Sequence, residues 1–164
     1  MSEDELVPLA PLPADVAATI GGIALSPWPT TLEELSSAYS GLGITVGDAL
    51  EPDGSGLTTY VLVSPEGVPG FAQFFSDEFI GVSFFAWDSP TAQFADTIRG
   101  FEELRTQLER RFGAGTVSDA EPRDVTWTLG AATISVQAFT TRDSIVQVGV
   151  EHTARSAAFS AASR

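Results

Sequence analysis

The stretch GFAQFFSDEFIGVSFFAW, residues 70–87, places seven aromatic rings in eighteen positions of a chain that is 10% aromatic overall. The segments on either side of Ser76-Asp77 are rich in aromatic and β-branched residues, which predicts an antiparallel hairpin with a tight Ser-Asp turn. Its second strand is apolar on both faces, with Ile80, Val82, Phe84 and Ala86 on one and Phe79, Phe85 and Trp87 on the other. Because such strands are usually central and covered on both sides, we expect burial under helices.

A long amphipathic helix follows the hairpin. Its apolar residues are spaced at helical intervals and end at Gly113: they are Phe94, Ile98, Phe101, Leu104, Leu108 and Phe112. The opposite face offers Arg99 to Glu103 and Arg105 to Glu109 at i,i+4, which predicts a solvated, self-paired surface. These ion pairs account for the arginines without a nucleic acid ligand.

The final third reads as a β meander of three strands, DVTWTL, AATISVQAF and SIVQVGVEH. Strict alternation predicts a core-facing set, namely Val125, Trp127, Leu129, Ile134, Val136, Val146, Val148 and Val150. The outward set is Thr126, Thr128, Ser135, Gln137, Gln147 and Glu151. One face of this sheet should therefore be exposed to solvent or covered by polar groups.

The remaining segments complete a prediction of one domain over residues 1–164. Residues 1–30 are Pro-rich and predict an extended lead-in with one short helix at 15–20, and residues 153–164 predict a flexible tail. Within the globular core, 31–152, a short helix and the strand LTTYVLVS precede the hairpin. The expected fold is α+β, with antiparallel sheet in α-β-β-β-α-β-β-β order and two helices packed on the sheet.

Charge is unevenly distributed along the chain. Residues 1–98 contain fourteen Asp or Glu and no basic residue, whereas residues 99–164 contain eight of each sign, so the net charge of −14 resides in the first part. Such a field repels nucleic acid and anionic lipid and steers a basic partner, although solubility alone also explains an acidic surface. The chain has no Cys, no long apolar run and an acidic start, from which we expect a cytoplasmic protein.

Few residues offer catalytic or ligand-binding chemistry. His152 is the only His and lies at a predicted strand end, so neither a catalytic triad nor a usual zinc site is expected. The loop DALEPDGSG, residues 48–56, lacks the register of a calcium loop and is interpreted as a turn. We therefore predict no enzyme activity, no catalytic residue, no metal and no cofactor.

Several generic elements together suggest a family. The chain combines three such elements. The first is Trp28-Pro29-Thr30-Thr31-Leu32-Glu33-Glu34-Leu35 with Leu42-Gly43-Ile44, the second is the helix ending Leu108-Glu109-Arg110-Arg111-Phe112-Gly113, and the third is the Trp127 strand. Over about residues 27–152 this pattern resembles small acidic actinobacterial immunity proteins, which are often encoded beside secreted polymorphic toxins. The resemblance implies a non-catalytic protein that binds and neutralises a cognate toxin. It carries no active site to transfer.

Residues 1–98 contain acidic but no basic residues, which suggests that a basic protein partner, such as a toxin, binds to this part of the chain. The predicted partner-binding residues are Asp77 and Glu78 at the hairpin tip and Glu51 and Asp53 in the loop that enters the same sheet. No nucleic acid or membrane partner is expected, and the oligomeric state stays open with a monomer favoured.

The alternative is an adaptor or secretion-chaperone-like protein that holds its partner in an apolar groove. Joint exposure of Phe75, Phe79, Phe85 and Trp87 would favour that groove, and their burial would favour the acidic rim. A purely structural domain is the third possibility.

Overall fold

The computed structural model describes residues 7–163. Within this range the chain forms four helices and eight strands. The helices are α1 (Pro13–Leu25), α2 (Leu32–Gly41), α3 (Ala95–Phe112) and α4 (Thr153–Ala162). The strands are β1 (Thr45–Ala49), β2 (Leu57–Val63), β3 (Pro69–Phe75), β4 (Glu78–Ser89), β5 (Thr116–Ser118), β6 (Arg123–Leu129), β7 (Ala132–Phe139) and β8 (Ser144–His152).

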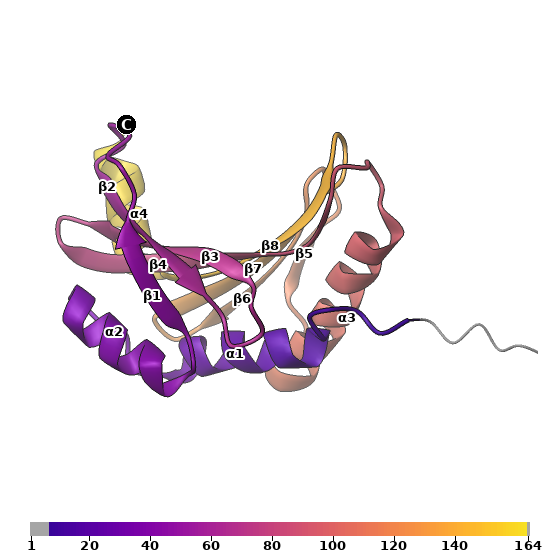
Figure 1. The fold of residues 1–164 in the computed structure, drawn as a ribbon, viewed down its shortest axis with the longest axis horizontal. Helices are drawn as coiled ribbons and strands as arrows, with labels where there is room; N and C mark the ends of the chain where they lie inside the picture. The colour runs from indigo at the N-terminus through magenta and orange to yellow at the C-terminus, as the bar shows by residue number, and fades with distance from the viewer. Residues whose placement is uncertain (1–6, 164) are drawn as a thin grey trace, which may run out of the picture.

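All of the described strands belong to one curved antiparallel sheet, in the order β1-β2-β3-β4-β8-β7-β6-β5 (Figure 1). It consists of two four-stranded meanders connected by α3. The meanders join where β4 pairs with β8, with Phe84 opposite Val148. The predicted hairpin is confirmed as β3 and β4, and β4 lies at the centre of the sheet.

The α+β class and the antiparallel pairing are correct, but the predicted order of elements with two helices is wrong. The extended lead-in instead contains α1, because Pro13 occupies the first helical turn, where its missing N–H costs nothing. The predicted flexible tail forms α4. Strands β1 and β5 were missed because they are short edge strands whose pairing with a neighbour, rather than their own residue pattern, defines them.

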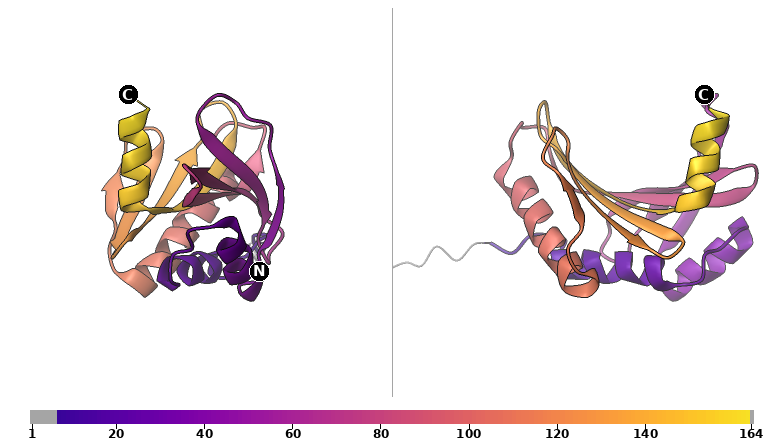
Figure 2. Two further views of the ribbon diagram at one scale, coloured as in Figure 1. Left: turned by 90° about the vertical axis from the view of Figure 1, so that its left-hand side faces the viewer. Right: turned by 180° about the vertical axis from the view of Figure 1, so that it is seen from behind.

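The helices cover the sheet unequally. Helices α1, α2 and α3 pack against the convex face, while α4 stands on the concave side at one end (Figure 2). The core lies between the sheet and the first three helices, where Leu35, Phe101, Leu104 and Leu108 are almost fully buried. Most of the concave face therefore has no helix over it, contrary to the expectation that β4 is covered on both sides.

Strand β4 also departs from strict alternation. The pairing with β3 shifts register between Gln73 and Phe74, and this bulge turns Phe79 and Val82 to the same, helix-covered face. Ile80 faces the concave side, where it lines a hollow, and Phe85 contacts Phe71 there. The predicted division of β4 side chains between two faces was therefore wrong at Phe79 and Ile80, whereas Val82 and Phe85 lie on opposite faces as predicted.

Trp87 also returns to the helix side, because its backbone has a φ of 50°. A positive φ is rare for a bulky residue and changes the direction of the side chain. Its indole packs closely against Gly100 of α3, and its Nε1–H donates to the carbonyl oxygen of Pro11 at 2.9 Å.

The alternation predicted for the last three strands is confirmed. The core-facing residues are buried except for Leu129, which is partly buried against the core, whereas the outward set is partly or fully exposed. The helix prediction is also confirmed, although α3 begins after Phe94, which is exposed. Among the described helices, none has both the length and the apolar composition needed to cross a bilayer.

Candidate functional site

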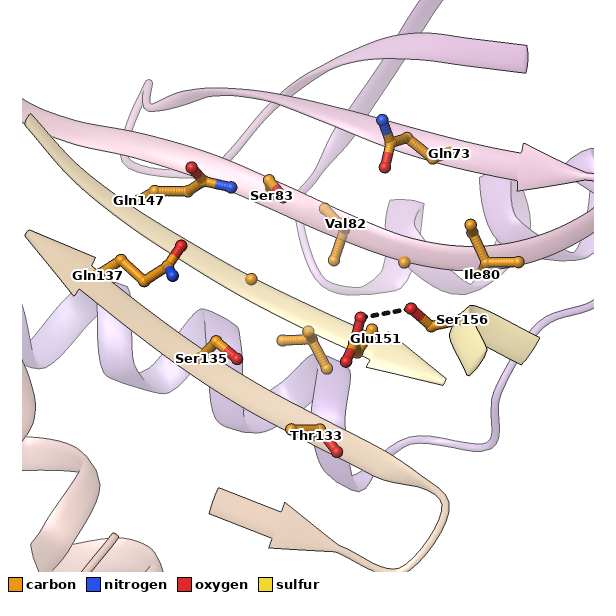
Figure 3. Close-up of a pocket in the computed structure, with 13 residues that line it drawn as sticks. Gln73, Ile80, Val82, Ser83, Thr133, Ser135, Gln137, Gln147, Glu151 and Ser156 are labelled. Carbon is orange, nitrogen blue, oxygen red and sulfur yellow. Dashed lines mark hydrogen bonds between the residues drawn. The ribbon is translucent and has the colours of Figure 1, made fainter. Parts of the chain in front are cut away.

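The concave face carries a shallow hollow of about 200 Å³ over β3, β4, β7 and β8 (Figure 3). Its floor is mainly polar and uncharged, and includes Gln73, Ser83, Thr133, Ser135, Gln137 and Gln147. Amide and hydroxyl groups offer both donors and acceptors. The surface can therefore hydrogen-bond to a polypeptide or another polar ligand, but it offers little charge of its own.

Helix α4 closes one end of this hollow. Ser156 Oγ donates to Glu151 Oε2 at 2.7 Å, which links α4 to the end of β8 (Figure 3). The ring of Phe159 packs edge-on against Phe75, with centroids 5.2 Å apart. Two further hydrogen bonds hold the start of α4, since Thr153 Oγ1 lies 2.7 Å from Thr133 Oγ1 of β7 and the Thr153 N–H donates to the carbonyl oxygen of Ala131 at 2.8 Å.

Arg155 provides the strongest attachment of α4. Its guanidinium donates to the carbonyl oxygens of Pro29 and Phe79 and to Thr30 Oγ1, and it lies 3.2 Å from Glu78 Oε2. One side chain thus connects α4, the hairpin and the segment before α2. Glu78, a predicted partner-binding residue, consequently has a structural role in fixing α4.

The four predicted partner-binding residues lie at one end of the sheet. Pairing of Leu57 with Phe75 brings the loop that contains Glu51 and Asp53 beside the Ser76-Asp77 turn. We call this surface the acidic edge and define it as Glu51, Asp53, Asp77 and Glu78. All four residues are exposed. The topology therefore brings together acids that lie up to 27 positions apart in the sequence.

Hydrogen bonding favours the charged form of Asp53. Its carboxylate accepts the backbone N–H of Ser55 at 2.9 Å. Side-chain and backbone hydrogen bonds from Ser55 lower the pKa of Asp53 from its ordinary value. Asp53 therefore contributes a full negative charge to the acidic edge at neutral pH.

The aromatic residues of the hairpin do not form a shared exposed groove. Phe79 is fully buried and Trp87 is 8% exposed, so these two rings do not form an exposed groove with Phe75 and Phe85. Phe75 is partly covered by Phe159, and Phe85 contacts Phe71 with ring centroids 5.8 Å apart. By the criterion set out above, this arrangement favours the acidic edge over an apolar groove.

Asp124 is a feature of the concave face that sequence patterns did not single out. It lies on β6 opposite Gln137, and its Oδ1 atom is buried without a hydrogen-bond partner among the described residues. Burial raises the pKa of this carboxyl above its ordinary value. Alternation with its outward-facing neighbours Thr126 and Thr128 places Asp124 on the same face. It does not indicate how deeply the Asp124 side chain is buried there.

His152 has a structural role as the N-cap of α4. Its Nδ1 accepts the backbone N–H of Arg155 at 3.2 Å, and its ring lies edge-on to Trp28. Within residues 7–163, no three His, Asp or Glu side chains lie close enough to hold a metal ion.

Comparisons of the chain with protein-family models, with curated proteins and with solved structures found no match.

Proposed function

We propose that this chain is a non-catalytic binding protein that recognises a basic protein partner through the acidic edge. The proposal rests chiefly on one observation, which is the convergence of Glu51, Asp53, Asp77 and Glu78 at one end of the sheet. Arg155 lies beside Glu78 but is already bonded to three oxygen atoms besides that carboxylate. Asp53 and Asp77 have no basic partner among the ion pairs of the described residues.

Long-range electrostatics explain why such a surface suits a basic partner. Clustered carboxylates at an edge make the local electrostatic potential more negative. This accelerates the encounter with a basic surface more than it prolongs the complex. The polar floor of the concave face lies on the same sheet and offers uncharged hydrogen-bonding groups to a docked chain. The acidic edge would thus steer the partner, and neutral contacts would hold it.

In its specific form, the proposed role is that of an immunity protein that neutralises a basic toxin in the cytoplasm. The sequence resemblance and the charge of −14 support this form. The alternative of an adaptor with an apolar groove has less support, because Phe79 and Trp87 are buried.

The test is association with the product of the adjacent gene, measured at low and moderate salt. The double variant Asp53→Asn/Asp77→Asn removes two charges, while Asn keeps the acceptor that Ser55 uses and tolerates the φ of 61° at position 77. The association rate at low salt should fall by about 3- to 10-fold, with a flatter salt dependence and little change in dissociation. Glu78 is left intact because its removal would also release Arg155.

The matched control is Asp119→Asn/Asp143→Asn, which removes the same charge from exposed positions outside the acidic edge. If both pairs slow association equally, only the net charge matters and the acidic edge is not the site. Association that does not respond to salt would remove the electrostatic proposal altogether.

A further inference from the structure

A second cavity lies at the other end of the β3–β4 hairpin, away from the acidic edge. It has a volume of about 580 Å³, within the range of pockets that hold small ligands or large side chains. Four segments form its walls: the strap 8–11, the turn 66–69, the end of β4 at 85–88 and the residues that open α3. We call it the strap pocket.

The lining of the strap pocket combines aromatic rings with carboxylates. Phe85, Trp87 and Phe94 supply the rings, and Phe94 is 37% exposed although it is large and apolar. Glu66, Asp88 and Asp96 supply the carboxylates, and the lining contains no basic residue. Rings and carboxylates together favour a cation, since the ring face and the carboxylate both attract positive charge.

The positive groups beside the strap pocket do not neutralise its carboxylates. Asp96 lies in the first turn of α3, where it offsets the partial positive charge of the helix N-terminus. Arg99, one turn later, donates to the carbonyl oxygen of Val7 at 2.6 Å and lies 3.9 Å from Glu103. Glu66 and Asp88 therefore remain without a cation in the ion pairs of the described residues.

Glu66 shows an unused acceptor at this position. Its Oε1 accepts the hydroxyl of Thr19 at 2.6 Å, whereas its Oε2 is buried and has no partner among the described residues. The same residue also lines two adjoining hollows beside α1. A buried carboxylate oxygen without a donor is unfavourable unless a ligand supplies one.

The walls of the pocket are held in place by hydrogen bonds. The turn that carries Glu66 is closed by Ser64, whose Oγ accepts the N–H of Val68 at 3.0 Å. The strap is fastened by the indole N–H of Trp87, which bonds to Pro11, and Thr97 donates to the carbonyl oxygen of Trp87. The site is thus formed before any ligand arrives, which lowers the entropy cost of binding.

We propose that the strap pocket binds the guanidinium group of an arginine side chain presented by a partner protein. Guanidinium fits this lining because it stacks on aromatic faces and donates several N–H groups to carboxylates in a fixed geometry. Its stem would lie against Phe85 and Phe94, and its donors would reach Glu66 and Asp88. The inference is independent of the acidic edge, from which the length of the hairpin separates it.

Nuclear magnetic resonance of the three tryptophan indole N–H groups tests the proposal without any partner. Trp87 lines the pocket, while Trp28 and Trp127 donate to Phe79 and Gly113 and serve as internal controls. The probe is the blocked tripeptide Gly-Arg-Gly, with the neutral isostere Gly-citrulline-Gly as its comparison. The arginine peptide should shift the Trp87 resonance saturably, with a Kd of about 1–10 mM, and leave Trp28 and Trp127 unchanged.

Two isosteric variants identify the carboxylates. Glu66→Gln keeps the acceptor for Thr19, and both Glu66→Gln and Asp88→Asn should weaken peptide binding by about 2- to 5-fold. Glu33→Gln, an exposed change on α2, removes the same charge away from the pocket and should leave the Kd unaltered.

Three outcomes would overturn the proposal. They are the absence of a saturable Trp87 shift, an equal shift with the citrulline peptide, and equal affinities for the Glu66→Gln, Asp88→Asn and Glu33→Gln proteins. Because the experiment uses the isolated protein and a peptide, its failure leaves the acidic-edge proposal standing. Failure of the acidic-edge experiment likewise leaves the strap pocket untouched.

Discussion

Replacing Gly100 by Ala should destabilise the protein, although the same change normally stabilises a helix. A Cβ at position 100 would lie closer than 3.0 Å to three atoms of the Trp87 indole. The indole cannot retreat easily, because Pro11 accepts its N–H and Thr97 donates to its backbone carbonyl. Overpacking of this kind costs about 1–3 kcal/mol, which outweighs a gain in helix propensity of about 1 kcal/mol.

Gly21 provides the matched control, because it is also a buried helical glycine. A Cβ there would meet its nearest neighbours, Arg111 Nη1 and Phe112 Cζ, at 3.5 and 3.6 Å, which is ordinary van der Waals contact. Gly21→Ala should therefore raise the free energy of unfolding by about 0.5–1 kcal/mol. The same Gly→Ala substitution is thus expected to lower the free energy of unfolding at position 100 and to raise it at position 21.

Urea unfolding followed by circular dichroism measures both effects as changes in the transition midpoint at constant m. In a Trp87→Ala background the three clashing ring atoms are absent, so Gly100→Ala should no longer destabilise, and this double-mutant cycle isolates the contact. A Gly100→Ala protein as stable as the Gly21→Ala protein would refute the reasoning. It would mean that α3 and β4 can move apart at little cost.

Three further predictions concern the core, α4 and the concave face. Leu108→Ala should lower the free energy of unfolding by about 2–5 kcal/mol, since Leu108 is fully buried, and an unchanged denaturation midpoint would contradict its place in the core. Arg155→Ala should speed hydrogen exchange of the α4 amides, whereas exposed Arg142→Ala should not; equal exchange in both would show that α4 is held by other contacts. Because burial raises the pKa of Asp124, stability falls as pH rises through that pKa, so Asp124→Asn should exceed wild type in stability at pH 7 but match it below about pH 4. A stability difference that does not vary with pH would contradict this assignment.

The candidate sites differ in how far local sequence patterns could reveal them. The acidic edge was predictable in its members, since turn and loop acids are exposed wherever the fold puts them. The bond between Glu78 and Arg155 was not predictable, because it joins the hairpin to a helix that begins 75 positions later. The strap pocket was also hidden, because its walls come from four separate segments that no single periodicity connects.

The sequence by itself determined the hairpin, the long helix α3 and the buried faces of the last three strands. These features depend on the side-chain period along one segment, and burial of Val136 or Leu108 follows from that period whichever neighbour covers it. The exceptions within β4 arise at a bulge beside Ile80 and at the positive φ of Trp87, both of which break the period locally.

Only the tertiary structure decided which strands pair, which face of the sheet is covered and where the second meander joins the first. Pairing of β4 with β8 brings Phe84 opposite Val148 across 64 positions of chain, and many other antiparallel pairings would satisfy the same alternation. The choice depends on the joint packing of α1, α2 and α3 on one face, which leaves the polar floor of the concave face open. Such choices are made by contacts between distant segments, because free energy there depends on which surfaces fit together rather than on the pattern within either one.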